Sequence, residues 1–123
     1  VGLSVEHVLP QNPAFDIKSY GFKDEAEFEE HKHRFGNLLL LESGVNSACK
    51  NVPVETKVTA PNLYAASALV SVKALAASRA GKPLGYKLEN IEDRSQSLAQ
   101  MALQRWPISV PVFATLSASQ TEG

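Results

Sequence analysis

Two short apolar segments, LSVEHVL at residues 3–9 and GNLLLLES at residues 36–43, most constrain how this chain can fold. The first segment alternates apolar side chains, and Pro10 ends it because proline cannot donate to a strand ladder. The second opens with a Gly-Asn turn signal and continues with four leucines, a length that suits a buried strand better than a helix. The sequence therefore predicts two strands, separated by a long connection from Gln11 to Phe35.

Two short helices are predicted around these strands. Within the connection, residues 23–35 (KDEAEFEEHKHRF) carry acids early and bases late, the order that the helix dipole favours. A second short helix can begin at Ser43, directly after the second strand. Pro53 limits it to about two turns, because proline inside a helix removes a hydrogen bond and clashes with the preceding turn.

Two longer helices are predicted in the second half of the chain. Residues 60–81 have a proline near the first turn and a glycine just past the end, the usual asymmetry of helix boundaries. Residues 88–107 form an amphipathic pattern that Pro107 stops. Its apolar stripe consists of Leu88, Ile91, Leu98, Met101 or Ala102, and Trp106. The tail at residues 109–123 ends polar, and we expect it to be flexible.

Composition narrows the class of protein. The chain has 123 residues, 44% of them hydrophobic, which predicts one compact domain with a real core. Twelve basic against thirteen acidic residues give a net charge of −1, so the chain lacks the overall positive field of a nucleic-acid coat protein. The single cysteine, Cys49, excludes an internal disulfide and makes the cytoplasm the default compartment. No membrane span or leader is expected, and the start at Val1 suggests a domain excised from a longer protein.

Four polar side chains stand out in or beside the predicted strands: Glu6, His7, Asn37 and Asn46. Polar groups in apolar strands are costly unless they are paired or used. Each has an ordinary explanation. His7 alone suits a core histidine, Glu6 a solvent-facing strand residue, Asn37 a turn residue and Asn46 a helix cap. Their order along the chain favours a shared site at the hairpin.

The segments VEHVLPQ, GNLLLL and ESGVNSACKNVP, in this order, resemble the ββα-metal core of HNH or His-Me finger nucleases. Together with IEDRSQSLAQMALQRWP, they resemble the C-terminal nuclease domain of GmrSD-type modification-dependent restriction enzymes, from about Ser4 to Pro107. The resemblance implies an α+β fold, in which a two-stranded antiparallel hairpin and a short helix (about residues 3–52) pack on two or three further helices, the helical part covering about residues 60–106. The nuclease domain would span residues 1–108.

The resemblance also implies a role for each polar residue. His7 matches the general base, which suits an imidazole whose pKa lies near 6.5. Asn37 matches an amide that braces the connection between the strands and so orients the base. Glu6 and Asn46 match the ligands of one Mg²⁺ or Mn²⁺ ion, which prefers oxygen donors. Because neighbouring strand residues point to opposite faces, Glu6 and His7 would have to reach the phosphate from two sides.

Five further side chains are candidates for phosphate contacts, where cations position a DNA backbone without reading its sequence. They are His33, Arg34, Lys50, Lys57 and Arg94. For Lys57 and Arg94, surface charge or a local salt bridge is an equally good explanation. Cys49 is expected to be a small buried hydrophobe rather than a nucleophile.

The leading functional hypothesis is a metal-dependent DNA endonuclease or nickase that acts in restriction or phage defence. The resemblance implies an upstream NTPase-like sensor domain of the same protein that recognises modified DNA, for example phosphorothioated, glucosylated or methylated DNA. The main alternative is a catalytically inactive DNA-binding or protein-docking module with the same fold. A zinc-dependent enzyme is disfavoured, because His and Cys ligands are too few and too scattered.

Overall fold

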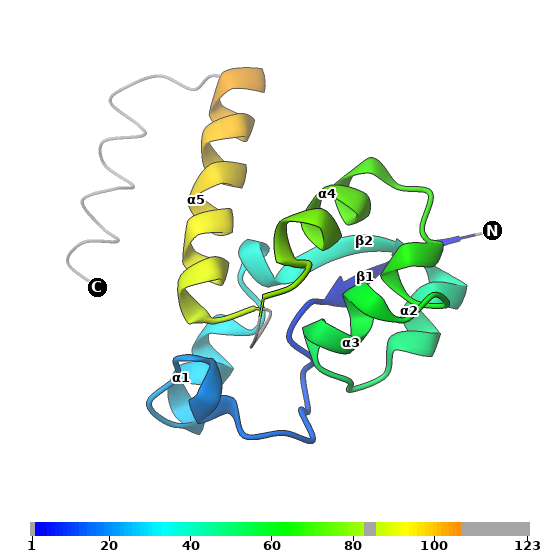
Figure 1. Ribbon diagram of the computed structural model, residues 1–123. Coiled ribbons are helices and arrows are strands. Elements are labelled where there is room, and N and C mark those ends of the chain that lie inside the picture. Colours follow the sequence, from blue (N-terminus) through cyan, green and yellow to red (C-terminus); the bar gives the residue numbers. More distant parts are fainter. Residues whose placement is uncertain (1, 83–85, 107–123) are drawn as a thin grey trace.

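The computed structural model describes residues 2–82 and 86–106, which form an α+β fold (Figure 1). Its sheet is an antiparallel hairpin of β1 (Leu3–His7) and β2 (Leu38–Glu42), followed directly by α2 (Ser43–Cys49). This ββα finger packs on the remaining helices, as the sequence predicts. The tail at residues 109–123 lies outside the described residues. No helix in the described ranges is long and apolar enough to cross a bilayer.

The hairpin has one buried and one open face. Leu3 pairs with Glu42 and His7 with Leu38, so the strands are in register over their full length. Leu39 and Leu41 are buried, whereas Val5 and Leu40 are directly opposite each other and more than half exposed. Although β2 contains four consecutive leucines, it is buried on one face only, because strand side chains alternate between faces.

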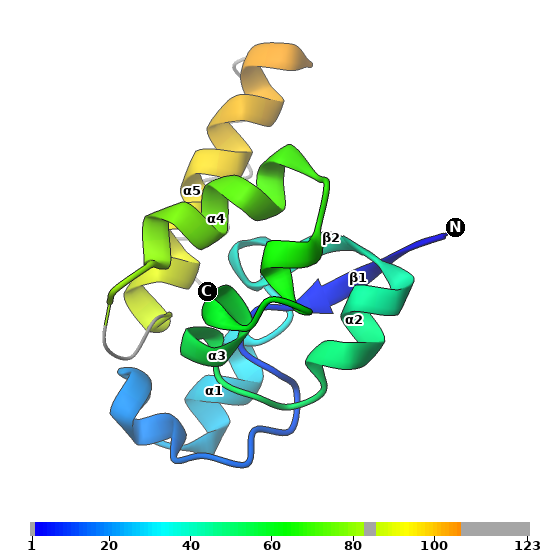
Figure 2. The same cartoon turned by 45° about the vertical axis from the view of Figure 1, so that its right-hand side comes forward.

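Three helices gather over the buried face of the hairpin: α2, α3 (Val54–Thr59) and α4 (Val70–Arg79) (Figure 2). The sequence predicts Pro53 only as the end of the preceding helix and does not predict α3. In the structure, Pro53 also stands at the start of α3. Pro53 is the N-cap of α3, and its ring restricts the backbone to a conformation that suits a helix start. Proline thus acts here as the boundary between two short helices.

The helix predicted over residues 60–81 is wrong in its first half. The chain there forms a 3₁₀ turn, η3 (Tyr64–Ala66), then an extended link, and only then α4. Glu42 at the end of β2 explains the break. Its carboxylate accepts hydrogen bonds from the Ser67 hydroxyl at 2.7 Å and the Ala68 amide at 2.8 Å. These bonds to another element hold the link outside a helical conformation.

The connection between the strands contains η1 (Ile17–Tyr20) and α1 (Glu25–His31), and it ends in the 3₁₀ turn η2 (Phe35–Asn37). As predicted, α1 is short and begins at acids, with Asp24 accepting a bond from the Glu27 amide. The long helix α5 (Leu88–Arg105) packs by its first half against η2. Its second half extends beyond the rest of the fold in both views.

The predicted apolar stripe of α5 is buried only at its start. Ile91 is fully buried, but Met101 is 62% and Trp106 is 70% exposed. The core itself lies between the hairpin and the surrounding helices. Its buried hydrophobic members are Val8, Leu9, Tyr20, Phe22, Phe28, Leu39, Leu41, Cys49, Val54, Leu63, Tyr64, Val72, Leu75, Tyr86 and Ile91.

Candidate active site

A polar cleft of about 340 Å³ opens between the end of β1, the segment that follows it, and α2. Three of the four polar residues predicted from the sequence, Glu6, His7 and Asn46, line this cleft. Lys50 stands at its edge with φ 48°, a left-handed conformation that ends α2. The other polar lining residues are Gln11, Asn12, Ser47 and Asn51. The cleft is therefore rich in amide and hydroxyl groups.

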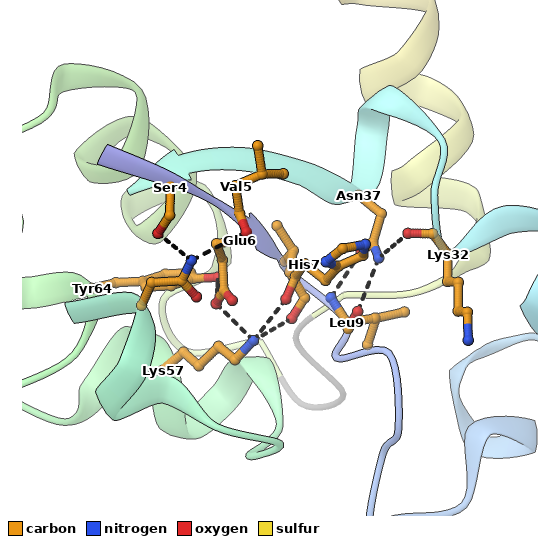
Figure 3. Close-up of polar contacts among 11 residues, drawn as sticks. Ser4, Val5, Glu6, His7, Leu9, Lys32, Asn37, Lys57 and Tyr64 are labelled. Carbon is orange, nitrogen blue, oxygen red and sulfur yellow. Dashed lines mark hydrogen bonds and ion pairs between the residues drawn. The ribbon is translucent and has the colours of Figure 1, made fainter. Parts of the chain in front are cut away.

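Asn37 lies outside the cleft and holds the chain that forms its wall. Its side-chain oxygen accepts a hydrogen bond from the Leu9 amide at 2.8 Å, and its amide nitrogen donates to the Leu9 carbonyl at 2.9 Å. The same nitrogen donates to the Lys32 carbonyl at 2.8 Å. Asn37 is fully buried, so these bonds are shielded from water. The side chain thus ties the end of β1 to the end of the connection (Figure 3).

Asn46 lies in the middle of α2 and faces β1. Its amide nitrogen donates to the Ser4 hydroxyl at 2.7 Å and to the Val5 carbonyl at 3.1 Å. The helix-cap explanation does not apply, because α2 begins three residues earlier at Ser43 and has no side-chain cap bond. These bonds fix the orientation of the amide, so the nitrogen faces the strand and the oxygen remains the acceptor of the group.

Glu6 and His7 point to opposite faces of β1, as strand alternation requires. The Glu6 carboxylate is only 4% exposed, and its Oε2 lies 2.8 Å from the ammonium of Lys57. The Tyr64 hydroxyl donates to the same oxygen at 2.8 Å. The predicted ligand is thus held from the inner side of the strand (Figure 3). Sequence periodicity carried no signal for Tyr64, which lies 58 positions from Glu6.

Lys57 is buried and paired, which favours the local salt bridge over the phosphate contact, the two explanations that the sequence left open. Its side chain is 0% exposed, and its ammonium donates to the His7 and Val8 carbonyls at 2.9 Å each, in addition to the ion pair with Glu6. A lysine buried in this way cannot reach a DNA backbone. Lys57 fixes the main chain of His7 from the buried side of β1.

Arg94 also makes its contacts within the protein. Its guanidinium donates to the carbonyls of Phe35, Gly36 and Leu38 at distances of 2.7–3.2 Å. The explanation as a local structural contact is therefore the better one. By fixing η2 against α5, Arg94 also fixes Asn37, the last residue of that turn.

His33 and Arg34 remain at the surface, where they line a separate hollow together with Phe35 and the α5 residues Ser95, Gln96 and Ala99. His33 contacts His7 directly, with its Nδ1 3.0 Å from the Nε2 of His7. Arg34 is exposed and lies 3.5 Å from Glu30, a distance at which an exposed pair contributes little. Nothing in the sequence pattern indicated the contact between the two histidines, because they are 26 positions apart.

The surroundings of His7 favour the neutral form of its ring. Burial is the main cause that lowers the pKa of His7 below 6.5, and the neighbouring charges of His33, Lys57 and Lys32 lower it further. Glu6 opposes them. A neutral imidazole has one unprotonated nitrogen, which is what a general base needs.

The chemistry of the cleft fits a hard divalent cation through oxygen donors. The described residues contain no group of three or more His, Cys, Asp or Glu side chains able to hold a metal ion. A cation here would therefore depend on Asn46, on Glu6, and on water and substrate oxygens. Mg²⁺ commonly keeps several waters and takes only one or two protein ligands. Lys57 and Tyr64 both contact Oε2 of Glu6, and the Cys49 thiol also bonds to this carboxylate, so a cation would compete with these contacts.

Comparison with known protein families matches residues 2–101 to the family described as GmrSD restriction endonucleases, C-terminal domain. No individual curated protein and no solved structure matched the chain. The family match covers both strands, the cleft and the first half of α5, so it includes every element that builds the site. The chain belongs to the family of GmrSD restriction endonuclease C-terminal domains.

Proposed function

We propose that this domain is a metal-dependent DNA endonuclease or nickase of the HNH type, with His7 as its general base. The observation that carries the proposal is the joint placement of the three polar residues. His7 and Asn46 line one cleft, while Asn37 ties down the chain two residues beyond His7. A family of restriction endonucleases supplies the reaction class, and the site supplies groups suited to it.

In the proposed reaction, His7 takes a proton from a water molecule in the cleft. The water oxygen forms a bond to the scissile phosphorus, the bond from phosphorus to the 3′ oxygen breaks, and that oxygen leaves with the electron pair and is protonated by solvent. Asn46 and Glu6 would hold one Mg²⁺ or Mn²⁺ ion, which supplies charge stabilisation for phosphate and leaving group. Lys57 and Asn37 hold the main chain on either side of the base.

DNA would lie across the cleft with few protein cations near it. Lys50 lines the cleft and Arg34 is exposed, which makes these two the proposed phosphate contacts. Such contacts fix position without reading sequence. With a net charge of −1, the domain has little non-specific attraction for DNA. We propose that an upstream NTPase-like sensor domain of the same protein selects modified DNA.

The decisive experiment is cleavage of supercoiled plasmid with Mg²⁺ or Mn²⁺, by the wild-type chain and by His7→Ala, Asn46→Ala and Lys73→Ala. Lys73 is exposed on α4 and serves as the matched surface control. We expect metal-dependent nicking that EDTA abolishes, that both site variants reduce at least a hundredfold, and that Lys73→Ala leaves unchanged. Undiminished nicking by His7→Ala would exclude it as the base.

A second measurement tests the cation without turnover. Mn²⁺ is paramagnetic, so its binding in the cleft should broaden the NMR signals of His7 and Asn46 before those of residues on α4. Asn46→Ala and Glu6→Gln should each weaken this effect. Plasmid binding without cleavage at any Mn²⁺ concentration would instead favour the non-catalytic DNA-binding module.

A further inference from the structure

We propose that His33 is the positioning residue of His7: it holds the ring and leaves Nδ1 of His7 as the nitrogen that takes the proton from water. This inference rests on the proposed function, in which His7 is the base. In this inference His33 acts by orienting His7, in place of the phosphate contact expected from the sequence.

The two rings meet in a bonding geometry. Nε2 of His7 lies 3.0 Å from Nδ1 of His33, and the ring centroids are 5.0 Å apart at an interplanar angle of 79°. At this distance the two nitrogens share one hydrogen. The rings meet edge to face, so the contact is directed rather than a stacking of flat surfaces.

The main chain holds the two histidines at this distance. Asn37 donates to the carbonyls of Leu9 and Lys32, which lie two residues after His7 and directly before His33. One buried side chain therefore clamps the two backbone segments that carry the rings. The turn around His33 is itself closed by bonds from the Arg34 amide to the His31 carbonyl and from the Asn37 amide to the Arg34 carbonyl. The contact is thus part of the fold, not a chance meeting of two surface side chains.

The chemistry of imidazole then decides which nitrogen is the base. A neutral ring has one N–H donor and one unprotonated acceptor, so a bond between two ring nitrogens needs a donor on one side and an acceptor on the other. The shared hydrogen can sit on either ring, but only one arrangement leaves His7 a free acceptor: if His7 is the base, its Nδ1 takes the proton from water. Nε2 must then carry the hydrogen, and Nδ1 of His33 must accept it.

This arrangement survives the reaction. When Nδ1 of His7 takes the proton, the ring becomes a cation with a hydrogen on both nitrogens, and Nε2–H still donates to His33. The bond becomes charge-assisted and therefore stronger at the moment when positive charge appears. A base oriented by a third group in this way follows the general logic of catalytic triads.

Two variants separate this role from a phosphate contact. His33→Phe keeps an aromatic ring of similar size but has no acceptor, while His33→Asn places an amide oxygen near the position of Nδ1. In plasmid nicking, we expect His33→Phe to lose roughly ten- to hundredfold in kcat with KM within twofold, and His33→Asn to recover most of that loss. A raised KM with unchanged kcat in His33→Phe would show that His33 only binds DNA and would overturn the proposal.

A spectroscopic readout decides the same question without turnover. ¹⁵N NMR of the ring nitrogens in the full chain, without DNA or metal, should show the hydrogen of neutral His7 on Nε2, and His33→Phe should shift the population toward Nδ1–H. Wild-type His7 with its hydrogen on Nδ1 overturns the assignment, whatever the nicking assay gives. If the tautomer is as assigned while no variant or wild type cuts DNA, the histidine pair stands and the nuclease function fails.

Discussion

Replacing Lys57 by methionine tests how much the buried contacts of Lys57 contribute to the stability of the fold around the site. Methionine matches the length of the lysine stem but has no charge and no donor. The Glu6 carboxylate, 4% exposed, then loses its counter-ion at 2.8 Å. The carbonyls of His7 and Val8 each lose a donor at 2.9 Å. The Tyr64 hydroxyl remains bonded to the carboxylate.

The expected loss of stability is large. Breaking a buried ion pair by removing one partner costs about 3–5 kcal/mol, because the remaining charge is left uncompensated. Domains of this kind are stable by only about 5–15 kcal/mol in total. For a domain of this length each kcal/mol corresponds to about 4 °C, so the melting temperature should fall by roughly 12–20 °C.

Urea unfolding followed by far-UV circular dichroism measures this loss. Trp106 is 70% exposed at the end of α5, which makes tryptophan fluorescence a poor reporter of the core. Lys73→Met, on the surface of α4, is the matched control and should stay within about 0.5 kcal/mol of wild type.

A double-mutant cycle then isolates the ion pair. Glu6→Gln combined with Lys57→Met removes both charges and lets Tyr64 keep an oxygen acceptor. The loss of unfolding free energy in the double variant should therefore be about 1–3 kcal/mol smaller than the sum of the losses in the two single variants. A loss below about 1 kcal/mol for Lys57→Met, or strict additivity in the cycle, would refute the reasoning.

Three further predictions concern other parts of the fold. The Cys49 thiol is buried and beside Glu6, which raises its pKa to about 12, so Ellman's reagent at pH 8 should label it only at the rate of unfolding. In Gly36→Ala, the added Cβ would lie 1.9 Å from the Ile91 carbonyl oxygen, so η2 and α5 should separate and the melting temperature should fall by at least 10 °C. An unchanged melting temperature would contradict this prediction. Hydrogen bonds, chiefly from the Ala68 amide, lower the pKa of Glu42 in the folded protein below its ordinary 4.5. The charged carboxylate therefore stabilises the fold above pH 4.5, and this stabilisation is lost as the pH falls through the pKa of Glu42 in the folded protein. Unfolding curves of Glu42→Gln should therefore differ from wild type at pH 7 and converge with it in acid; a difference that is constant with pH would be evidence against it.

Local signals in the sequence predicted the elements that build the cleft. Pro10 and the Gly-Asn pair at residues 36–37 limit the strands, and the helix begins at Ser43 as predicted, although without a side-chain cap bond. These signals act within a few residues of the element that they end or begin. The order of Glu6, His7, Asn37 and Asn46 then placed the site at the hairpin, and the structure brings His7 and Asn46 to one cleft.

What the sequence could not reveal depends on partners far along the chain. The first half of the predicted helix at residues 60–81 has good helix formers, but Glu42 captures the link at Ser67 and Ala68. Tertiary bonds override local preference in such cases. Lys57 and Arg94 are basic residues in a domain expected to bind DNA, yet their partners are main-chain carbonyls, which every residue has and no sequence pattern displays.

Those bonds to main-chain groups have an evolutionary consequence. Asn37, Lys57 and Arg94 grip carbonyl or amide groups of residues whose own side chains take no part in the bond. These bonds do not depend on the side chains of the residues that they hold, so exposed Phe35 can be exchanged for another apolar residue without losing its bond to Arg94, whereas residues 8 and 9 remain constrained by packing in the core. The three gripping residues have no such freedom. Side-chain changes at such an exposed position therefore leave the main-chain bonds, and with them the cleft, in place.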